Sequence, residues 1–119
     1  MHGAQAYSKV AKVTVGPRDL EATLLLKAAA KLQSASEQWS GMSPQLDEAL
    51  SYNRKLWTIL LTSVTRPENP LPKPIRENVA NLGLFILNHT MSVISDPKAE
   101  KMGVLITINR ELAAGLRAG

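Results

Sequence analysis

The stretch DEALSYNRKLWTILLTSV, at residues 47–64, has the pattern of an amphipathic helix with one polar residue in its apolar row. Large apolar side chains recur at helical spacing through this stretch and at the position before it: Leu46, Leu50, Trp57, Leu60 and Val64. The position that this spacing requires between Leu50 and Trp57 is occupied by Asn53. The stretch therefore predicts a core-packed helix that carries an amide inside the core or at its edge.

Prolines stand at the start of this helix and of three other stretches with helical spacing. Proline fits the first position of a helix because its missing N–H would be unpaired there. Ser43 and Asp96 each precede such a proline and are good N-cap residues. The pattern predicts four main helices and a shorter one: 17–38, 44–65, 73–95, 97–117 and 3–13.

Short connections between these helices predict that neighbours in the sequence pack antiparallel, as in a helical bundle. The chain has 119 residues, of which 45% are hydrophobic, enough for one core without disulfides. We therefore expect an all-α, single-domain antiparallel bundle over residues 1–119. The stretch GVLITI at 103–108 also suits a strand, but helical spacing continues through Leu105 and Leu112, and we favour a helix.

Composition and charge exclude several functional classes. The chain has no cysteine, and its net charge of +4 is spread along the sequence between acidic residues. The longest apolar stretch, at 82–87, is far below the length of about 20 residues that spans a bilayer. The first residues do not have the pattern of a secretory signal. We expect a soluble cytoplasmic protein with no membrane span.

The residues available for catalysis or metal binding are few. His2 and His89 are the only histidines, and neither has a second ligand-type residue at metal-binding spacing. No nucleophile motif or phosphate-binding glycine loop is present. We therefore expect no enzyme activity, no metal and no cofactor.

Polar residues occupy apolar rows on three different helices: Asn53, His89 and Asn109. One interpretation is a buried hydrogen-bonded layer that fixes how the helices align. The other is a partner-binding groove, in which the amides meet an incoming segment and Trp57, Leu84 and Phe85 supply apolar contact. Spacing alone favours the buried layer.

Five stretches of the chain resemble the FlaF family of flagellar biosynthesis regulators: AYSKVAK (6–12), GPRDLEATLLLKAA (16–29), SYNRKLW (51–57), NLGLFILNHT (81–90) and GVLITINRELAAGL (103–116). They keep the order and approximate spacing of the family's blocks over nearly the whole chain. The resemblance implies a cytoplasmic protein of bacterial flagellum assembly. With the resemblance taken into account, the buried layer and the partner-binding groove are equally favoured interpretations of Asn53, His89 and Asn109.

The resemblance also implies partners and a role. Flagellin is the expected direct partner, and the regulator FlbT and flagellar export components are further ones. The implied role is a flagellin-binding secretion chaperone that promotes flagellin synthesis or secretion. The alternative is a post-transcriptional regulator that acts on flagellin mRNA directly or through FlbT. Direct RNA binding is disfavoured, because the chain has five aromatic residues and no basic cluster.

We expect flagellin to bind with the apolar face of an amphipathic segment in a groove of the second, third and last main helices. In this hypothesis the apolar side chains supply contact area, and the amides and the arginine fix orientation. The residues assigned to the groove are Tyr52, Asn53, Trp57, Leu84, Phe85, Asn88, Asn109 and Arg110.

Overall fold

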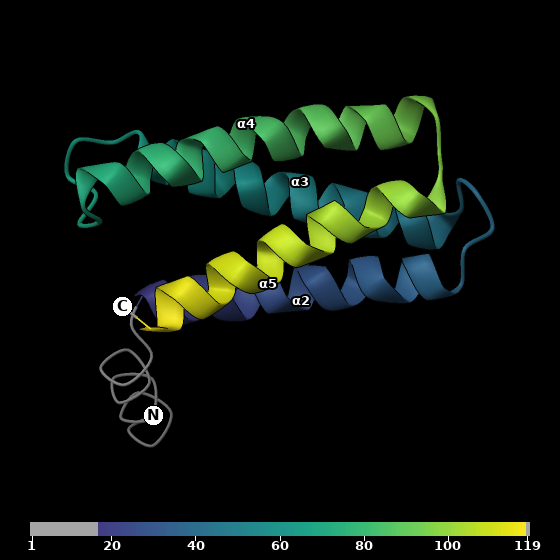
Figure 1. Ribbon diagram of the computed structural model, residues 1–119, viewed down its shortest axis with the longest axis horizontal. Helices are drawn as coiled ribbons and strands as arrows, with labels where there is room; N and C mark the ends of the chain where they lie inside the picture. Colours follow the sequence, from purple (N-terminus) through teal and green to yellow (C-terminus); the bar gives the residue numbers. More distant parts are fainter. Residues whose placement is uncertain (1–16, 119) are drawn as a thin grey trace, which may run out of the picture.

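The computed structural model describes residues 17–118, which form four α-helices and one short 3₁₀ turn (Figure 1). Their bounds are α2 Pro17–Glu37, α3 Pro44–Val64, α4 Lys73–Ser95, η1 Ala99–Lys101 and α5 Met102–Ala118. Successive helices run in opposite directions, which confirms the predicted all-α antiparallel bundle. The predicted helix at 3–13 lies outside the described residues.

The starts of the helices follow the proline signals, with one exception. Ser43 caps α3, and its Oγ accepts a hydrogen bond from the backbone N–H of Leu46 at 3.1 Å. The last helix was expected from residue 97, but the chain first forms the 3₁₀ turn η1, and α5 begins at Met102. Residues 103–108 are helical, so the favoured alternative for that stretch is correct.

The helices are arranged as two pairs, α2 with α5 and α3 with α4, joined through the contact of α2 with α3. In Figure 1 α5 lies along α2, whereas α4 lies along α3. Alanines make the first pair close: Ala22, Ala28 and Ala29 of α2 and Ala113 of α5 are all buried. Small side chains let two helix backbones approach, so α5 stays with α2 along its length.

A glycine sets the distance between α3 and α4. A Cβ atom at Gly83 would lie 3.3 Å from Cδ1 of Leu61 and 3.5 Å from the ring of Trp57. The helices therefore approach most closely where α4 has no side chain, and Trp57 fills the space beneath it. Ile86 and Val93 continue the buried row of α4 on either side of Thr90.

The connection between α4 and α5 is fixed by hydrogen bonds around Lys101. Its ammonium donates to the backbone carbonyl of Asp96 at 2.9 Å and to that of Ser92 at 3.1 Å. These contacts satisfy carbonyls at the C-terminal end of α4, where cations are favourable. The Lys98 ammonium, 3.3 Å away, lowers the pKa of the exposed Asp96 carboxyl. Helices α4 and α5 meet at this end and diverge toward the other (Figure 1).

Candidate partner-binding groove

Two of the polar residues singled out in the sequence meet inside the core. Nδ2 of Asn109 donates to Oδ1 of Asn53 at 2.7 Å, and it lies 3.5 Å from the backbone oxygen of Leu25. The indole N–H of Trp57 donates to Oδ1 of Asn109 at 2.9 Å. All three side chains are fully buried. These contacts tie α2, α3 and α5 together and use both polar atoms of the Asn109 amide.

Asn53 is satisfied on one side only. Its Oδ1 accepts from Asn109, but among the described residues its Nδ2 has no hydrogen-bond partner. A buried polar group left without a partner costs on the order of 1–3 kcal/mol. Asn109 is therefore the centre of this polar contact, and Asn53 is its less satisfied member.

His89 does not belong to this polar contact. It is half-buried, stacks on Phe85 with ring centroids 5.3 Å apart, and its Nε2–H donates to the backbone oxygen of Lys101 at 2.8 Å. Its position on α4 lies to one side of the buried row, which instead contains Thr90. The Thr90 hydroxyl donates to the backbone oxygen of Ile86 within the same helix at 2.7 Å. Inclusion of His89 in a shared layer with Asn53 and Asn109 was therefore wrong.

The residues assigned to a groove from sequence lie in separate places. Asn53, Trp57 and Asn109 are core side chains, so they do not border open space. Tyr52 is half-buried, with the ammonium groups of Lys27 and Lys31 within 5.7 Å and 5.1 Å of its ring centroid. The remaining four are exposed on α4 and α5: Leu84, Phe85, Asn88 and Arg110. They do not form one groove.

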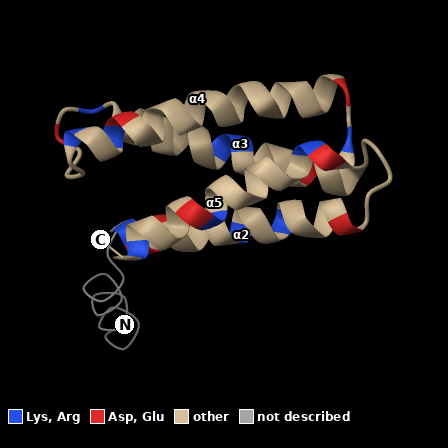
Figure 2. Cartoon of the chain, in the orientation of Figure 1, with Lys and Arg blue, Asp and Glu red and all other residues tan. Residues whose placement is uncertain are grey.

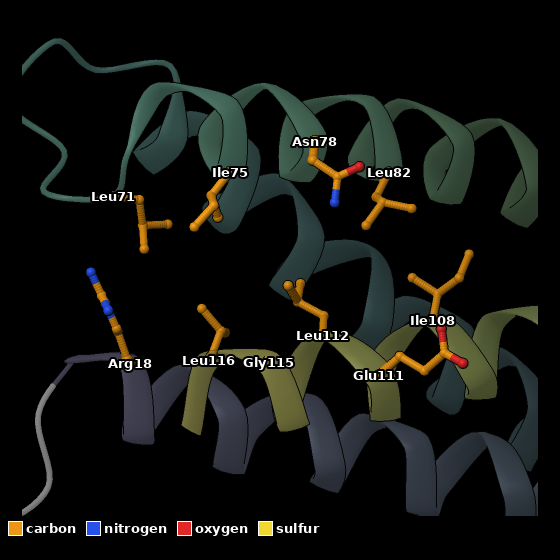
Figure 3. Close-up of a pocket in the computed structure, with 10 residues that line it drawn as sticks. All are labelled: Arg18, Leu71, Ile75, Asn78, Leu82, Ile108, Glu111, Leu112, Gly115 and Leu116. Atoms are coloured by element: carbon orange, nitrogen blue, oxygen red, sulfur yellow. The ribbon is translucent and has the colours of Figure 1, made fainter. Parts of the chain in front are cut away.

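An apolar groove does exist, between the first half of α4 and the second half of α5 (Figure 3). Its volume is about 340 Å³. We call it the α4–α5 groove. Its walls come from the two helices, from the connection that precedes α4 and from the first turn of α2. The residues that line it are Arg18, Leu71, Ile75, Asn78, Leu82, Ile108, Glu111, Leu112, Gly115 and Leu116.

The divergence of α4 from α5 explains why these apolar side chains are accessible. Positions 108, 112 and 115 lie on the flank of α5 that faces α4, beside the row that Asn109 buries. Because α5 follows α2, α4 is too far away at this end to cover that flank. Ile75 remains 44% exposed although it continues the buried row of α4, and Leu82 and Leu112 are half-buried.

The groove has an open end and a closed end. At the closed end the hydrogen bond from His89 to Lys101 joins α4 to the 3₁₀ turn η1, which directly precedes α5. On α4 the wall positions 75, 78 and 82 keep the spacing of one helical row, and Phe85 and His89 continue it. Phe85 is therefore the one residue of the sequence-based set that stands next to the α4–α5 groove. Arg18 and Leu71 mark its open end.

The charges around the groove are few and of both signs. Arg18 and Glu111 line it, and Asn78 adds an uncharged amide. In the first turns of α2 partial burial raises the pKa of Glu21, and nearby Arg18 opposes that rise. Apart from His89, residues 78–95 contain no ionisable side chain, and Figure 2 shows this part of α4 without charge. A partner would meet mainly apolar and amide surface.

Sequence reasoning missed the groove because its wall residues have the spacing of core residues. Ile75 and Leu82 continue the same apolar row as Val79 and Ile86, which are buried. The available signal was an excess of apolar flanks: α4 has a second apolar row outside the buried one, and Ile108 lies outside the buried row of α5. More apolar flanks than the core can bury indicate that some apolar surface stays uncovered. The sequence does not show where on the fold that surface lies.

The family comparison covers almost the whole chain. Residues 3–116 match the family model described as flagellar protein FlaF. The chain belongs to the FlaF family. The match includes every residue of the α4–α5 groove, so the groove is part of the FlaF domain. No curated protein and no solved structure matches the chain. None of the FlaF helices within residues 17–118 is long and apolar enough to cross a membrane.

Proposed function

We propose that this chain is a non-enzymatic, cytoplasmic flagellin-binding chaperone that promotes flagellin synthesis or secretion. The observation that carries the proposal is the α4–α5 groove, an accessible apolar surface in a protein of a flagellar family. Six of its lining residues are apolar, and several retain exposed area that a partner would cover. A surface of this kind marks a site of protein association.

The groove suits the apolar face of an amphipathic helix. Two roughly facing helices with apolar side chains accept a third helix through residues at i, i+3, i+4 and i+7. Along α5 the wall from position 108 to position 116 is about 12 Å long, which corresponds to about two helical turns. Helical segments of flagellin need such cover before they assemble, because their apolar faces would otherwise associate with one another.

The polar residues of the groove would fix how the bound helix lies. Arg18 at the open end favours a carboxylate on the partner, whereas Glu111 on α5 favours a cation. The amide of Asn78, on the opposite wall, can accept or donate a hydrogen bond. These three groups select orientation, and the apolar walls supply the binding energy.

The first test is co-expression with the cognate flagellin. We expect the two proteins to co-purify at a near-equimolar ratio, and truncation of one flagellin terminus to abolish the complex. If intact flagellin fails to co-elute with well-folded protein under any condition, direct chaperoning is wrong.

A matched pair of substitutions on α5 tests the groove itself. Gly115 lines the α4–α5 groove and Gly103 does not, and an added Cβ has nothing within 4 Å at either position. Gly115→Leu should fill the groove and weaken flagellin binding at least about tenfold, a loss of about 1.4 kcal/mol. Gly103→Leu puts the same side chain on the same helix outside the groove and should leave the affinity unchanged. Equal effects of both substitutions would remove the groove from the proposal.

A second surface supports a regulatory role through FlbT. On the flank of α4 away from the groove, Leu84, Met91 and Ile94 are exposed and uncharged residues surround them on the helix. Exposed apolar side chains on one helix flank suit a second protein partner. We propose FlbT for it. Met91→Lys should weaken binding of FlbT and leave binding of flagellin intact, and loss of both would show that the two surfaces are not independent.

A further inference from the structure

We propose that a face formed by α2 and α3 binds an acidic segment of a partner protein. Carboxylates of the segment meet Lys27 and Lys55, and an apolar side chain of the segment packs beside them. Two rows of side chains form this surface, which we call the α2–α3 face: Leu20, Leu24, Lys27, Lys31 and Ser34 on α2, and Gln45, Glu48, Tyr52, Lys55 and Ile59 on α3. None of them lines the α4–α5 groove or belongs to the α4 surface proposed for FlbT, so this binding is independent of both.

Three contacts between α2 and α3 keep one register along this face. The pairs are Ser34 with Gln45 at 3.0 Å, Lys31 with Glu48 at 2.7 Å, and the Lys27 ammonium with the ring centroid of Tyr52 at 5.7 Å. Each step back along α2 therefore equals a step forward along α3, as expected for an antiparallel pair (Figure 1). A further step of about two turns on each helix brings Leu20 level with Ile59.

Leu20 and Ile59 form the apolar end of the α2–α3 face. Their exposed fractions are 53% and 66%, and Ile59 is the most exposed large apolar side chain within residues 17–118. Ile59 also borders two shallow hollows, one shared with Lys55 and the other with Arg66. Exposed apolar side chains next to hollows suit a side chain of a protein partner.

The charges of the α2–α3 face favour an acidic partner. It carries three lysines and one carboxylate, Glu48, which Lys31 pairs at 2.7 Å. Within residues 17–118, Lys27 and Lys55 form no salt bridge. Two cations without a carboxylate partner, next to apolar surface, attract a segment that carries carboxylates and an apolar residue together.

A protein segment fits this face better than a nucleic acid does. Single-stranded nucleic acids bind by stacking bases on aromatic rings along a basic groove. Tyr52 is the one aromatic ring of the α2–α3 face, and the ammonium groups of Lys27 and Lys31 lie over it at 5.7 Å and 5.1 Å from its centroid. The accessible apolar side chains, Leu20 and Ile59, are aliphatic.

The register defines the order of residues in a helical segment that lies along this face. Lys55 is about 6 Å along α3 from Ile59, and Lys27, level with Tyr52, is about 10 Å from it. A bound helix therefore needs an apolar residue at one position and carboxylates about one and two turns away on the same side.

Peptide-display selection with the full chain as bait tests the chemistry of the partner. The library consists of random peptides of about 16 residues, roughly four helical turns. Peptides that also bind the double variant Lys27→Glu, Lys55→Glu are removed, which discards those that bind at other surfaces. We expect the remaining peptides to carry Asp or Glu about one and two turns from a large apolar residue. Recovery of no peptide, or of peptides without this pattern, would overturn the proposal.

The affinity of a recovered peptide for single variants locates its site. Lys55→Glu and Ile59→Ala should each weaken binding at least about fivefold, because one reverses an attraction and the other removes apolar contact. Arg110→Glu and Ile94→Ala make the same changes at exposed positions of α5 and α4 and should leave Kd unchanged. Urea denaturation checks that every variant is folded. Equal losses for Lys55→Glu and Arg110→Glu would reduce the effect to net charge and contradict the assigned face.

Two further measurements separate this face from other ways of binding. In methyl NMR, the recovered peptide should shift the signals of Ile59 and leave those of Ile108 unchanged. A shift of Ile108 alone would place the peptide in the α4–α5 groove and overturn the proposal. A single-stranded oligouridine should not bind at physiological salt. RNA binding that Lys55→Glu abolishes would assign the face to nucleic acid instead of an acidic protein segment.

Discussion

The two flanks of α5 show opposite combinations of polarity and burial. On one flank Asn109 is polar and fully buried, in contact with Asn53 and Trp57. On the other flank, Ile108 and Leu112 are apolar and remain partly accessible in the α4–α5 groove. Ile108 is next to Asn109 on α5, and Leu112 lies about one turn further along the same helix.

The difference shows that helix arrangement decides burial here more than residue type does. The Asn109 flank is covered by α2 and α3, so its amide must find partners inside the core. The Ile108 flank faces α4, which has diverged, so apolar side chains stay open. The core flank therefore carries stability, and we assign binding to the open flank.

Trp57→Ala gives the largest expected effect and tests the core side of the comparison. Trp57 has 0% exposure and donates to Asn109, so its removal leaves a large cavity and an unpaired amide oxygen. We expect a loss of about 3–5 kcal/mol in the free energy of unfolding, measured by urea denaturation. A variant with wild-type stability but without flagellin binding would instead place Trp57 in the interface.

Asn109→Ala should cost more than Asn53→Ala. The first change leaves both the Trp57 indole N–H and Oδ1 of Asn53 without their partner, at an expected cost of about 2–4 kcal/mol. The second change removes a side chain that is already half-satisfied and should cost about 1–2 kcal/mol. Urea denaturation of both variants measures the order, and a reversed order would show that Asn53, rather than Asn109, is central.

Ile75→Ala tests the groove side, with Ile86→Ala as a matched control on the same helix. Ile75 is 44% exposed and Ile86 is 0% exposed. We expect less than about 1 kcal/mol for Ile75→Ala and about 2–5 kcal/mol for Ile86→Ala, by the same measurement. Similar costs at the two positions would mean that the groove wall is covered in the free protein.

Glu21→Gln should have the smallest effect and a defined pH dependence. Burial raises the pKa of Glu21 in the folded state, so the ionised form destabilises the fold at neutral pH. Below the pKa that Glu21 has in the unfolded chain, its carboxyl is neutral in both states and burial carries no penalty. As the pH rises through the higher pKa of the folded state, the buried carboxyl ionises and the free energy of unfolding falls. Glu21→Gln should therefore raise the free energy of unfolding by less than about 1 kcal/mol at pH 7, and by nothing at pH 3. Thermal unfolding at both pH values measures this, and a gain that persists at pH 3 would contradict the sign.

Much of the fold could be predicted from the sequence because its signals are local. Prolines and apolar spacing gave the bounds of α2, α3 and α4 to within one residue. The start of α5 was missed because the Lys101 contacts favour a 3₁₀ turn before it, and those contacts depend on where α4 ends. The amide at Asn53 was correctly singled out as anomalous within an apolar row.

The site was harder to predict because it depends on distances between helices. Spacing places His89 close to the buried row, but only the packed fold shows that Lys101 takes its hydrogen bond instead. Spacing also cannot distinguish Ile75 from Ile86, because both continue one row and the separation of α4 from α5 differs between them. The buried alanines that let α5 lie close to α2 favour this separation, and most of them lie on α2, far in sequence from α4.

The joint between His89 and Lys101 gives the α4–α5 groove the shape of a wedge with a fixed apex. Because α4 and α5 diverge from that joint toward Arg18 (Figure 1), we expect small side chains of a guest to fit near the joint and bulky ones near Arg18. A guest helix graded in size along its length would fit in one direction only. The shape of the taper can thus read the polarity of a bound segment before any charged group is engaged.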